Sequence, residues 1–343
     1  MMKFKENIKK IYSHIANDYS KEMFINRLMY SLTSDNQYIL NVIKMTPEGR
    51  VFISKLQNKK KNLIFGAGAW GKEILNTFSN VKFECFVDSK TKKSNYAGLQ
   101  VISFDEYLSR FSEETIIIAT RLYHQEIYEQ LKKSGISDAN IINAGKMIDE
   151  MSHRQYFDLP ELKTRKENLE IFVDAGSFDG ATSLAFLDWC GESIGKIWAF
   201  EPEKKNAQIC EANMKKAQGG GYNIIPFGLW NKKETLHFQS GASGASRIIE
   251  DGDSSIEVNC LDAMLNKEPI TFIKMDLEGA EYNALLGAEK TIKEYKPKLA
   301  ISIYHKPEDI WELPQLILKM NPDYHFYFGH YSIAAAETVL YTL

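Results

Sequence analysis

Two glycine-rich segments of the sequence have the spacing of nucleotide-binding loops. The first is FGAGAWG, from Phe65 to Gly71, a GxGxxG pattern. Backbone amides of such a loop contact phosphate at a helix N-terminus, and Asp88, which ends the next apolar run, could bind ribose hydroxyls. The same glycines also suit simple strand-to-helix packing. The residues that follow supply no convincing hydride-transfer motif. Tyr128 and Lys132 do have the YxxxK spacing of some NAD-dependent enzymes, but they lie on a charged amphipathic helix and have no companion serine, so we interpret the spacing as coincidental.

The second segment, VDAGSFDGATS from Val173 to Ser183, combines glycines with carboxylates. Asp174 ends an apolar run and Asp179 lies within the loop, and two carboxylates there would repel phosphate. Gly176 and Gly180 would let the backbone pass close to a ligand. A cationic ligand fits this loop better, and S-adenosylmethionine carries an ammonium and a sulfonium but no phosphate.

An acid also ends the next apolar run. Glu201 follows KIWAF, at the position where a carboxylate can accept hydrogen bonds from both ribose hydroxyls, and Pro202 then ends the strand. Acids at strand ends are also common as solvent-facing residues. The joint order of strand, DxGxxxG loop, helix, strand and Glu-Pro nevertheless predicts an S-adenosylmethionine site.

Methyl transfer from a sulfonium requires alignment, exclusion of water and a base for the acceptor proton, because the cofactor carries the activated methyl group. Candidate residues should lie at the carboxyl ends of the strands. Lys274, Asp276 and Glu278 surround the end of one apolar run, and His305 ends the following one. We predict these four residues as catalytic, with Asp276 or His305 as the base.

Structural roles are the alternative for the acids and the histidine. Acids near a helix N-terminus stabilise it by about 0.3–1 kcal/mol, and we assign Glu281 to that role. A backbone carbonyl could satisfy His305 equally well. The spacing requires no metal, and we predict no metal ligands. A divalent cation stays open as an alternative, held by Asp276, Glu278, His305 and His330.

The elements that position these residues alternate between strands and helices in two series. Between Asn62 and Ala144 the apolar runs are LIF, FECFVD, TIIIAT and ANII. A second series starts at Glu170 and runs EIFVDAG, KIWAF, YNIIPF, TLHFQ, IEVN, TFIKMD, KLAISIY, YHFYF and ETVLYTL. Such alternation builds parallel sheets covered by helices, and the short loop before the last run suits an antiparallel edge pair. The stretch from Gly241 to Arg247, rich in small residues, could close over the site.

We therefore expect an α/β protein with two doubly wound domains. Apolar residues at helical spacing predict a short helical lead-in over residues 1–61, and a small Rossmann-like domain follows over residues 62–146. The polar segment 147–169, which contains Pro160, is expected to be a connector. The second α/β domain would occupy residues 170–343.

The second domain resembles the FkbM family of methyltransferases. Besides the loop and the Glu-Pro pair, the resemblance rests on PFGLWNKKETLHF, VNCLDAML, FIKMDLEGAEYNALLGAEKTI, KPKLAISIYHKPEDI and HYSIAAAETVLY, in this order. It covers Glu170 to Leu343. It implies a class I methyltransferase domain with a seven-stranded sheet, an antiparallel final strand, helices on both faces and S-adenosylmethionine as cofactor.

The resemblance also implies which residues hold the cofactor. The methionine part would lie among Asp174, Gly176, Ser177 and Gly180, the ribose at Glu201, and the adenine at Gly228 and Leu229. Asp276 would lie at the mouth of the site. To these cofactor-binding residues we add Asp179 and Pro202 from the loop and the strand end.

The first domain resembles, more loosely, the small Rossmann-like modules attached to nucleotide-sugar and polysaccharide-modifying enzymes. The residues that carry this likeness are FGAGAWG, FVDS, GLQVIS and IIIAT. A structural or partner-docking role is the function we expect for this domain.

Composition limits the partners. The chain has 343 residues, of which 44% are hydrophobic and 25% charged, enough for two separate cores. A formal net charge of −3 gives no reason to expect nucleic acid or an anionic membrane as the main partner. No segment approaches the roughly 20 apolar residues of a membrane helix, and we expect a cytoplasmic protein. The scattered cysteines predict reduced thiols.

The sequence thus predicts an S-adenosylmethionine-dependent O-methyltransferase that acts on a hydroxyl of a sugar, a glycan or a small molecule. Two alternatives come from other classes. One is a non-catalytic scaffold protein that binds a nucleotide or nucleotide-sugar in glycan biosynthesis, and the other is an NAD-linked oxidoreductase that uses FGAGAWG.

Overall fold

A computed structural model describes residues 2–57, 61–91, 93–111, 113–217, 221–239, 247–248 and 254–343. The chain forms two compact units. Unit 1 comprises Met1–Ser31, Arg154–Gly329 and Glu337–Leu343, and unit 2 comprises Leu32–His153 and His330–Ala336. The helices of the expected lead-in are thus divided between the two units.

Unit 2 contains a six-stranded sheet in the order β3-β4-β2-β1-β5-β6. Strands β4, β2, β1, β5 and β6 run parallel, and β3 is antiparallel to β4. The strands are β1 (Asn62–Phe65), β2 (Phe83–Val87), β3 (Asn95–Tyr96), β4 (Leu99–Ile102), β5 (Thr115–Ile118) and β6 (Ile141–Ile142). The helices are α3 (Asn36–Met45), α4 (Pro47–Gln57), α5 (Ala69–Thr77), α6 (Phe104–Arg110), α7 (His124–Lys133) and α8 (Ala144–Arg154). This is the doubly wound Rossmann-like arrangement that the alternating apolar runs predict.

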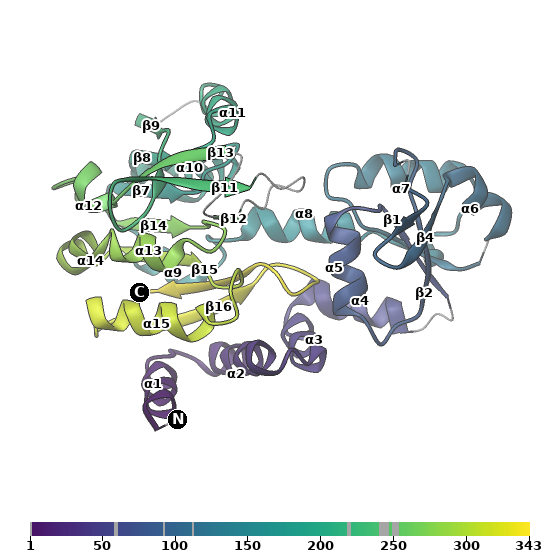
Figure 1. The fold of residues 1–343 in the computed structure, drawn as a ribbon, viewed down its shortest axis with the longest axis horizontal. Helices are drawn as coiled ribbons and strands as arrows, with labels where there is room; N and C mark the ends of the chain where they lie inside the picture. The colour runs from purple at the N-terminus through teal and green to yellow at the C-terminus, as the bar shows by residue number, and fades with distance from the viewer. Residues whose placement is uncertain are drawn as a thin grey trace. The chain divides into compact units, whose positions relative to one another are not determined.

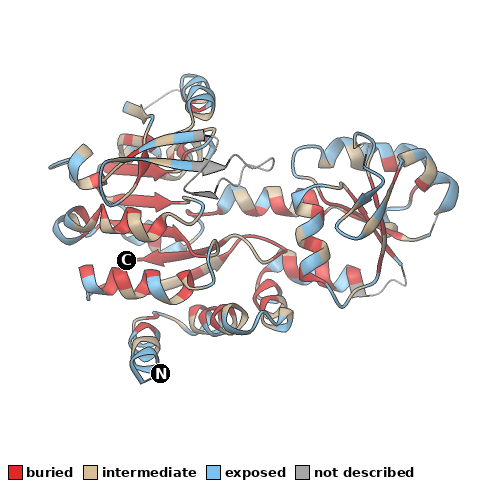
Figure 2. Cartoon of the chain, viewed as in Figure 1, coloured by how far each residue is buried: buried red, intermediate tan, exposed pale blue. Residues whose placement is uncertain are grey.

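Unit 1 contains a seven-stranded sheet in the order β16-β17-β15-β14-β7-β8-β9 (Figure 1). Its strands are β7 (Glu170–Ala175), β8 (Ile194–Phe200), β9 (Gly221–Ile225), β14 (Phe272–Met275), β15 (Lys298–Ser302), β16 (Phe326–His330) and β17 (Thr338–Thr342). Strands β7, β14, β15 and β17 are buried at every residue, as Figure 2 shows. Strand β17 is antiparallel to β15, so the expected seven-stranded class I methyltransferase sheet is confirmed.

Two of the expected strands lie outside this sheet. TLHFQ and IEVN belong to a four-stranded sheet in the order β10-β13-β11-β12. Its strands are β10 (Gly228–Leu229), β11 (Glu234–Gln239), β12 (Arg247–Ile248) and β13 (Ser254–Asn259). The helices of unit 1 are α1 (Met2–Ser13), α2 (Asp18–Thr33), which ends in unit 2, α9 (Pro160–Thr164), α10 (Ala181–Cys190), α11 (Lys204–Met214), α12 (Leu261–Met264), α13 (Glu281–Leu286), α14 (Glu289–Tyr295) and α15 (Asp309–Met320).

An aromatic cluster fixes helix α10 against the centre of the main sheet. The rings of Phe172 on β7 and Phe186 on α10 stack with centroids 4.2 Å apart. Phe157, Trp189 and Phe272 surround this pair. Because the loop from Gly176 to Gly180 joins β7 to α10, this packing fixes both ends of the loop.

Helix α2 and the segment between α1 and α2 cover the edge strand β16. The backbone N–H of Phe326 donates to His14 O at 2.8 Å, and that of Phe328 donates to the Ser20 hydroxyl at 3.0 Å. The ring of Phe24 packs on that of Phe328, with centroids 5.5 Å apart. Covering an edge in this way removes a template for pairing with other chains.

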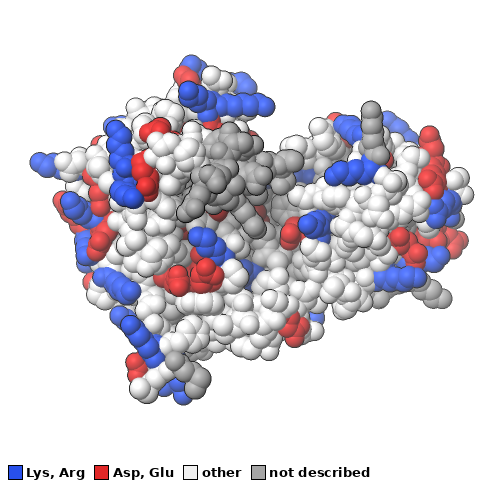
Figure 3. Space-filling model, in the orientation of Figure 1, with Lys and Arg blue, Asp and Glu red and all other residues white. Residues whose placement is uncertain are grey.

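The surface and the cysteines have ordinary features. Acidic and basic side chains are interspersed on the face shown in Figure 3. Cys85, Cys190 and Cys210 are buried free thiols, as expected, and Cys260 is a half-buried one. Among the described residues, the helices are too short or too polar to span a membrane.

Candidate active site

The loop after β7 is tied to the ends of two neighbouring strands. The backbone N–H groups of Gly176 and Ser177 both donate to Phe200 O at the end of β8, at 3.0 Å each. Gly176 has φ +76°, and a Cβ at this position would lie 2.0 Å from Asp276 O, just after β14. Glycine is therefore needed at this position because the loop backbone passes so close to the backbone of Asp276. The sequence had predicted a different reason, the close approach of a ligand.

The second glycine of the loop begins helix α10. Gly180 has φ +85°, and a Cβ there would lie 3.0 Å from Cys210 Sγ. The Asp179 carboxylate accepts from the N–H of Ala181 at 3.0 Å, and Asn213 donates to Asp179 O at 2.9 Å. Asp179 thus caps the first turn of the helix, and α11 holds the loop from outside.

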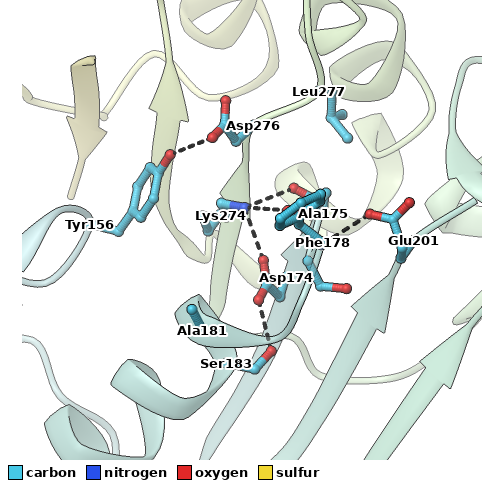
Figure 4. Close-up of polar contacts among 12 residues, drawn as sticks. Tyr156, Asp174, Ala175, Phe178, Ala181, Ser183, Glu201, Lys274, Asp276 and Leu277 are labelled. Carbon is cyan, nitrogen blue, oxygen red and sulfur yellow. Dashed lines mark hydrogen bonds and ion pairs between the residues drawn. The ribbon is translucent and has the colours of Figure 1, made fainter. Parts of the chain in front are cut away.

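A buried ion pair supports the loop (Figure 4). Lys274 Nζ lies 3.0 Å from Asp174 Oδ1, and both residues are at most 1% exposed. Asp174 Oδ2 accepts from the Ser183 hydroxyl at 2.7 Å, and Lys274 also donates to Gly176 O at 2.8 Å. Both residues were expected to face reactants, Asp174 at the methionine part and Lys274 in catalysis. Both carboxylate oxygens of Asp174 are thus engaged within the protein, and the Lys274 ammonium is enclosed.

Glu201 lies where an acid for the ribose is expected. Its Oε2 accepts from the N–H of Phe178 at 3.0 Å and its Oε1 from the N–H of Glu203 at 2.9 Å. Burial raises the pKa of Glu201, and these two hydrogen bonds oppose that rise. A carboxylate oxygen has two lone pairs, so each oxygen can accept one further hydrogen bond, which fits two ribose hydroxyls.

The residues expected around the adenine lie next to this strand end. A Cβ at Gly228 would lie 3.7 Å from Pro202 Cγ and 3.0 Å from Val258 Cγ1, so β10 approaches the segment after β8 closely. Leu229 is buried. Phe178, whose backbone contacts Glu201, is 55% exposed, and its φ of +49° is unusual for a residue with a side chain.

Asp276 lies in a cluster of hydroxyl groups. Tyr156 donates to its Oδ2 at 2.9 Å and Tyr304 to its Oδ1 at 3.4 Å, while the Tyr156 and Ser302 hydroxyls lie 3.1 Å apart. Burial alone would raise the pKa of Asp276, but the charges of Lys274 and His305 and the hydrogen bonds from Tyr156 and Ser302 lower it. Asp276 is therefore an ionised hydrogen-bond acceptor.

His305 is surrounded by carboxylates. Its Nδ1 lies 2.9 Å from Glu281 Oε1, and its Nε2 lies 3.4 Å from Asp276 Oδ1 and 3.8 Å from Glu278 Oε2. Burial opposes the charged form, yet Glu281 and the other two acids raise the pKa of His305 to about 9. An imidazole with that pKa is protonated near neutral pH. The arrangement therefore favours a cationic donor over the general base considered from the sequence.

The two acids beside His305 differ in exposure. Glu281 is fully buried and accepts from the N–H of Leu277 at 2.7 Å, in the turn before α13. It therefore contacts this turn and the histidine, whereas the N-cap of α13 has no side-chain hydrogen bond. The Glu278 side chain is 49% exposed and has φ +52°. Burial raises the pKa of Glu278.

Sequence reasoning missed Glu337. Its Oε2 accepts from Gln155 Nε2 at 2.8 Å, and the same amide donates to the Tyr156 hydroxyl at 3.1 Å. Burial, together with the charge of Asp276, raises the pKa of Glu337 to about 7. The signal was present: the final strand is antiparallel, so its amino end, and not its carboxyl end, reaches the edge of the sheet that carries the site.

A metal is not needed to explain this cluster. Among the described residues, the group that could hold an ion is Asp276, Glu281 and His305, whose ligand atoms lie within 4.8 Å of one another. The contacts above already pair these carboxylates with the imidazolium. We assign no divalent cation. The expected lid over the site, residues 241–246, lies outside the described residues.

Two of the three glycines in the first glycine loop lie close to other parts of the protein. Gly66 has φ +117°, and a Cβ at Gly71 would lie 2.3 Å from Gly66 O, so these glycines serve strand-to-helix packing. The Asp88 carboxylate, expected as a ribose ligand, accepts instead from backbone N–H groups at 2.8–3.0 Å, those of Ala67, Lys90 and Thr91.

The YxxxK spacing of unit 2 has a structural explanation. The Tyr128 hydroxyl lies 2.7 Å from Asp138 Oδ1, and Lys132 Nζ lies 3.0 Å from Asp138 Oδ2. Both residues therefore contact one acid on the surface, in agreement with the interpretation that the spacing is coincidental.

The fold defines unit 1 as a class I methyltransferase domain, with a glycine loop and a buried acid, Glu201, at the carboxyl ends of β7 and β8. Residues 174–328 match the family model described as Methyltransferase FkbM domain. The C-terminal half of the chain is therefore an S-adenosylmethionine-dependent methyltransferase domain of the FkbM family. Residues 58–142 match the model described as C2185-like, N-terminal.

One solved structure agrees with this fold, and two others are more distantly similar. The methyltransferase FkbM from Methylobacillus flagellatus KT is similar at 20% identity with a TM-score of 0.50, over 87% of this chain and 94% of that chain. Fibrillarin from Aeropyrum pernix, in complex with natively bound S-adenosyl-L-methionine, is similar at 9% identity (TM-score 0.36; 56% of this chain, 76% of that chain). A SAM-dependent methyltransferase from Aquifex aeolicus is similar at 14% identity (TM-score 0.33; 57% and 96%). A search of the curated proteins gives no match.

Proposed function

We propose that the protein is an O-methyltransferase that transfers the methyl group of S-adenosylmethionine to a hydroxyl of a sugar, a glycan or a small molecule. The observation that carries the proposal is the contact between the loop and the acidic cluster. A Cβ on Gly176 would lie 2.0 Å from Asp276 O, so the cofactor loop and the residue at the mouth of the site are in direct contact.

The chain's own residues account for binding of the cofactor. Glu201 would accept hydrogen bonds from the ribose hydroxyls, and the loop from Gly176 to Gly180, with Ser177, would surround the methionine part. Pro202, Gly228 and Leu229 would lie against the adenine. When bound, S-adenosylmethionine supplies an electrophilic methyl group on a sulfonium.

The polar cluster suits an acceptor that carries several hydroxyl groups. Asp276 and Glu278 offer acceptors, while Tyr156, Tyr304 and the His305 imidazolium offer donors. A sugar hydroxyl donates and accepts at the same time, so it can pair with both kinds of group. Glu278, exposed at the mouth, would contact the outer part of such an acceptor.

The alternatives from the first glycine loop have no support of this kind. Asp88 already accepts three backbone hydrogen bonds, which leaves it one lone pair for the ribose of a nucleotide-sugar or NAD, against two at Glu201. We assign unit 2 a structural or partner-docking role.

Calorimetry and labelled cofactor test the proposal together. S-adenosylmethionine should bind the wild-type protein, and Glu201→Ala should weaken that binding about tenfold or more, because two hydrogen bonds to a carboxylate are lost. Glu192→Ala, on an exposed acid, is the matched control. Methyl transfer is then measured from radiolabelled cofactor to a panel of nucleotide-sugars and free glycans. Heat with NAD and none with S-adenosylmethionine would contradict the proposal.

A further inference from the structure

Three residues in the Asp276 cluster, and one beside Glu201, have a strained backbone. Of the eight described non-glycine residues with positive φ, four are Tyr156, Phe178, Glu278 and Glu337. Such conformations are unfavourable for residues with a side chain, and the strain persists where the surrounding structure imposes it, often at functional sites. Tyr156 and Glu337 are strained, yet neither is among the catalytic residues predicted from the sequence. The strain therefore draws attention to their side of the cluster.

Gln155 and Tyr156 connect Glu337 to Asp276. Glu337 Oε2 lies 2.8 Å from Gln155 Nε2, which lies 3.1 Å from the Tyr156 hydroxyl, and that hydroxyl donates to Asp276 Oδ2 at 2.9 Å. An amide N–H and a hydroxyl between two carboxylates hold them at a fixed separation, while each carboxylate keeps further lone pairs for a ligand. Glu337 is half-buried.

We propose that Glu337 is the catalytic residue that accepts the proton of the acceptor hydroxyl, and that Gln155 and Tyr156 are positioning residues that hold it beside Asp276. This inference rests on the proposed function. The acceptor oxygen loses its proton to the Glu337 carboxylate as it bonds to the methyl carbon. The electron pair of the methyl–sulfur bond stays with sulfur, so atoms and charge balance.

The titratable groups around Glu337 come from three segments of the chain, and their arrangement fits this role. Asp276 follows β14, Tyr304 and His305 follow β15, and Tyr156 precedes α9. Burial and the Asp276 charge raise the pKa of Glu337 to about 7, whereas that of Asp276 is lowered. Two coupled carboxyl groups with separated pKa values take different roles: the weaker acid accepts a proton near neutral pH, and the stronger acid stays ionised.

A titration of the free protein tests the inference without any acceptor. Glutamate labelled with ¹³C at the side-chain carboxyl gives a resonance for Glu337 that disappears in Glu337→Gln, or in Glu337→Asp should the first variant not fold. We expect this resonance to titrate near pH 7 and at lower pH in Asp276→Asn, which removes the neighbouring charge. Titration of Glu337 at the ordinary pKa of a glutamate, about 4.3, would overturn the inference.

Turnover provides the second readout, with whichever panel acceptor the wild type methylates. Glu337→Gln should lower kcat by about 10²–10⁴ while the Kd for S-adenosylmethionine stays unchanged, and Glu337→Asp should recover part of the loss. Exposed Glu192→Gln is the control. Full activity in Glu337→Gln would refute the role. Absence of cofactor binding by the wild type would refute the proposed function, whereas an ordinary titration with intact cofactor binding would refute this inference alone.

Discussion

At the scale of single residues, the pair Asp174 and Lys274 links the stability of the fold to the shape of the loop. Removing one partner of a buried ion pair leaves the other charge without compensation, which costs about 3–5 kcal/mol. We predict that Lys274→Met lowers the stability of unit 1 by that amount. Urea unfolding followed by tryptophan fluorescence measures it, since every tryptophan except Trp70 lies in unit 1.

An exposed ion pair provides the control for this prediction. Lys293 and Glu289 lie 2.6 Å apart with both side chains about half exposed, so Lys293→Met should cost about 0–1 kcal/mol. The double variant Asp174→Asn with Lys274→Met should be more stable than Lys274→Met alone. Equal losses in Lys274→Met and Lys293→Met would show that the buried pair does not support the loop.

Asp309 gives the fold a dependence on pH. Burial raises the pKa of Asp309 from 3.8 to about 7, so the folded state holds a proton that the unfolded state releases. Its contribution to stability is therefore fully present below pH 3.8 and is lost as pH rises through 7. We predict that Asp309→Asn, which keeps an acceptor for the Lys306 N–H, stabilises the protein by about 2–3 kcal/mol more at pH 8.5 than at pH 5. Urea unfolding at both pH values measures this.

The exposed residue Glu312 lies in the same first turn of α15 and provides the control. Glu312→Gln should have little effect at either pH. A gain from Asp309→Asn that is the same at pH 5 and pH 8.5 would contradict the proposed origin of the effect.

The sequence allowed prediction of some site residues but not of others. Asp276 and Glu201 were predictable because each directly follows an apolar run, and strand ends are where parallel sheets present side chains. Tyr156 and Gln155 come from the segment expected to be a connector, and their contacts depend on tertiary packing alone. The sequence showed that acids lie near His305 in the chain. Only their distances from the imidazole in the structure explain why the pKa of His305 is raised.

At the scale of elements, the loop between β7 and α10 is the most constrained connection in the site. We predict that Gly176→Ala destabilises unit 1 by at least about 1–3 kcal/mol, because it combines a positive φ with a Cβ 2.0 Å from Asp276 O. Binding of S-adenosylmethionine should weaken with it. Thermal unfolding and calorimetry measure the two effects.

Gly221→Ala is the matched control, since this glycine has no positive φ and nothing lies within 4 Å of an added Cβ. It should be nearly neutral. Normal cofactor binding by Gly176→Ala would show that the loop tolerates a shift away from β14.

The strands themselves were predictable, but not all of their pairings were. Buried runs such as EIFVDA are continuous and apolar because helices cover both faces of the sheet. TLHFQ and IEVN were found as strands, yet β11 and β13 pair with each other in a separate sheet. Short alternating runs carry no information about which sheet they join, because that depends on partners distant in the sequence.

At the scale of the whole molecule, unit 2 is inserted into unit 1. Residues Met1–Ser31 belong to unit 1, which resumes at Arg154. The sequence predicted a lead-in, a first domain and a second domain in linear order, and it could not predict that the lead-in packs on the second domain. Apolar residues at helical spacing indicate a helix but not the sheet on which the helix packs. The contacts of α2, and of the segment between α1 and α2, with β16 supply that information.

The two units should respond differently to the cofactor. We predict that S-adenosylmethionine slows amide hydrogen exchange in Gly176–Gly180 and around Glu201, and leaves the loop after β1 in unit 2 unchanged. Hydrogen exchange with mass spectrometry compares them, with NAD as the control ligand. Protection of Gly66–Gly71 by either ligand would contradict the assignment of those glycines to packing.

The covering of β16 by the first helices also bears on synthesis. Phe24 packs on Phe328, and β17 lies between β15 and β16, so the earliest helices and the latest strands depend on each other. On the ribosome, α2 leaves the exit tunnel long before its partner strand is translated. Its apolar face, with Met23 and Phe24, then stays open on the nascent chain, where holding chaperones bind segments of this kind.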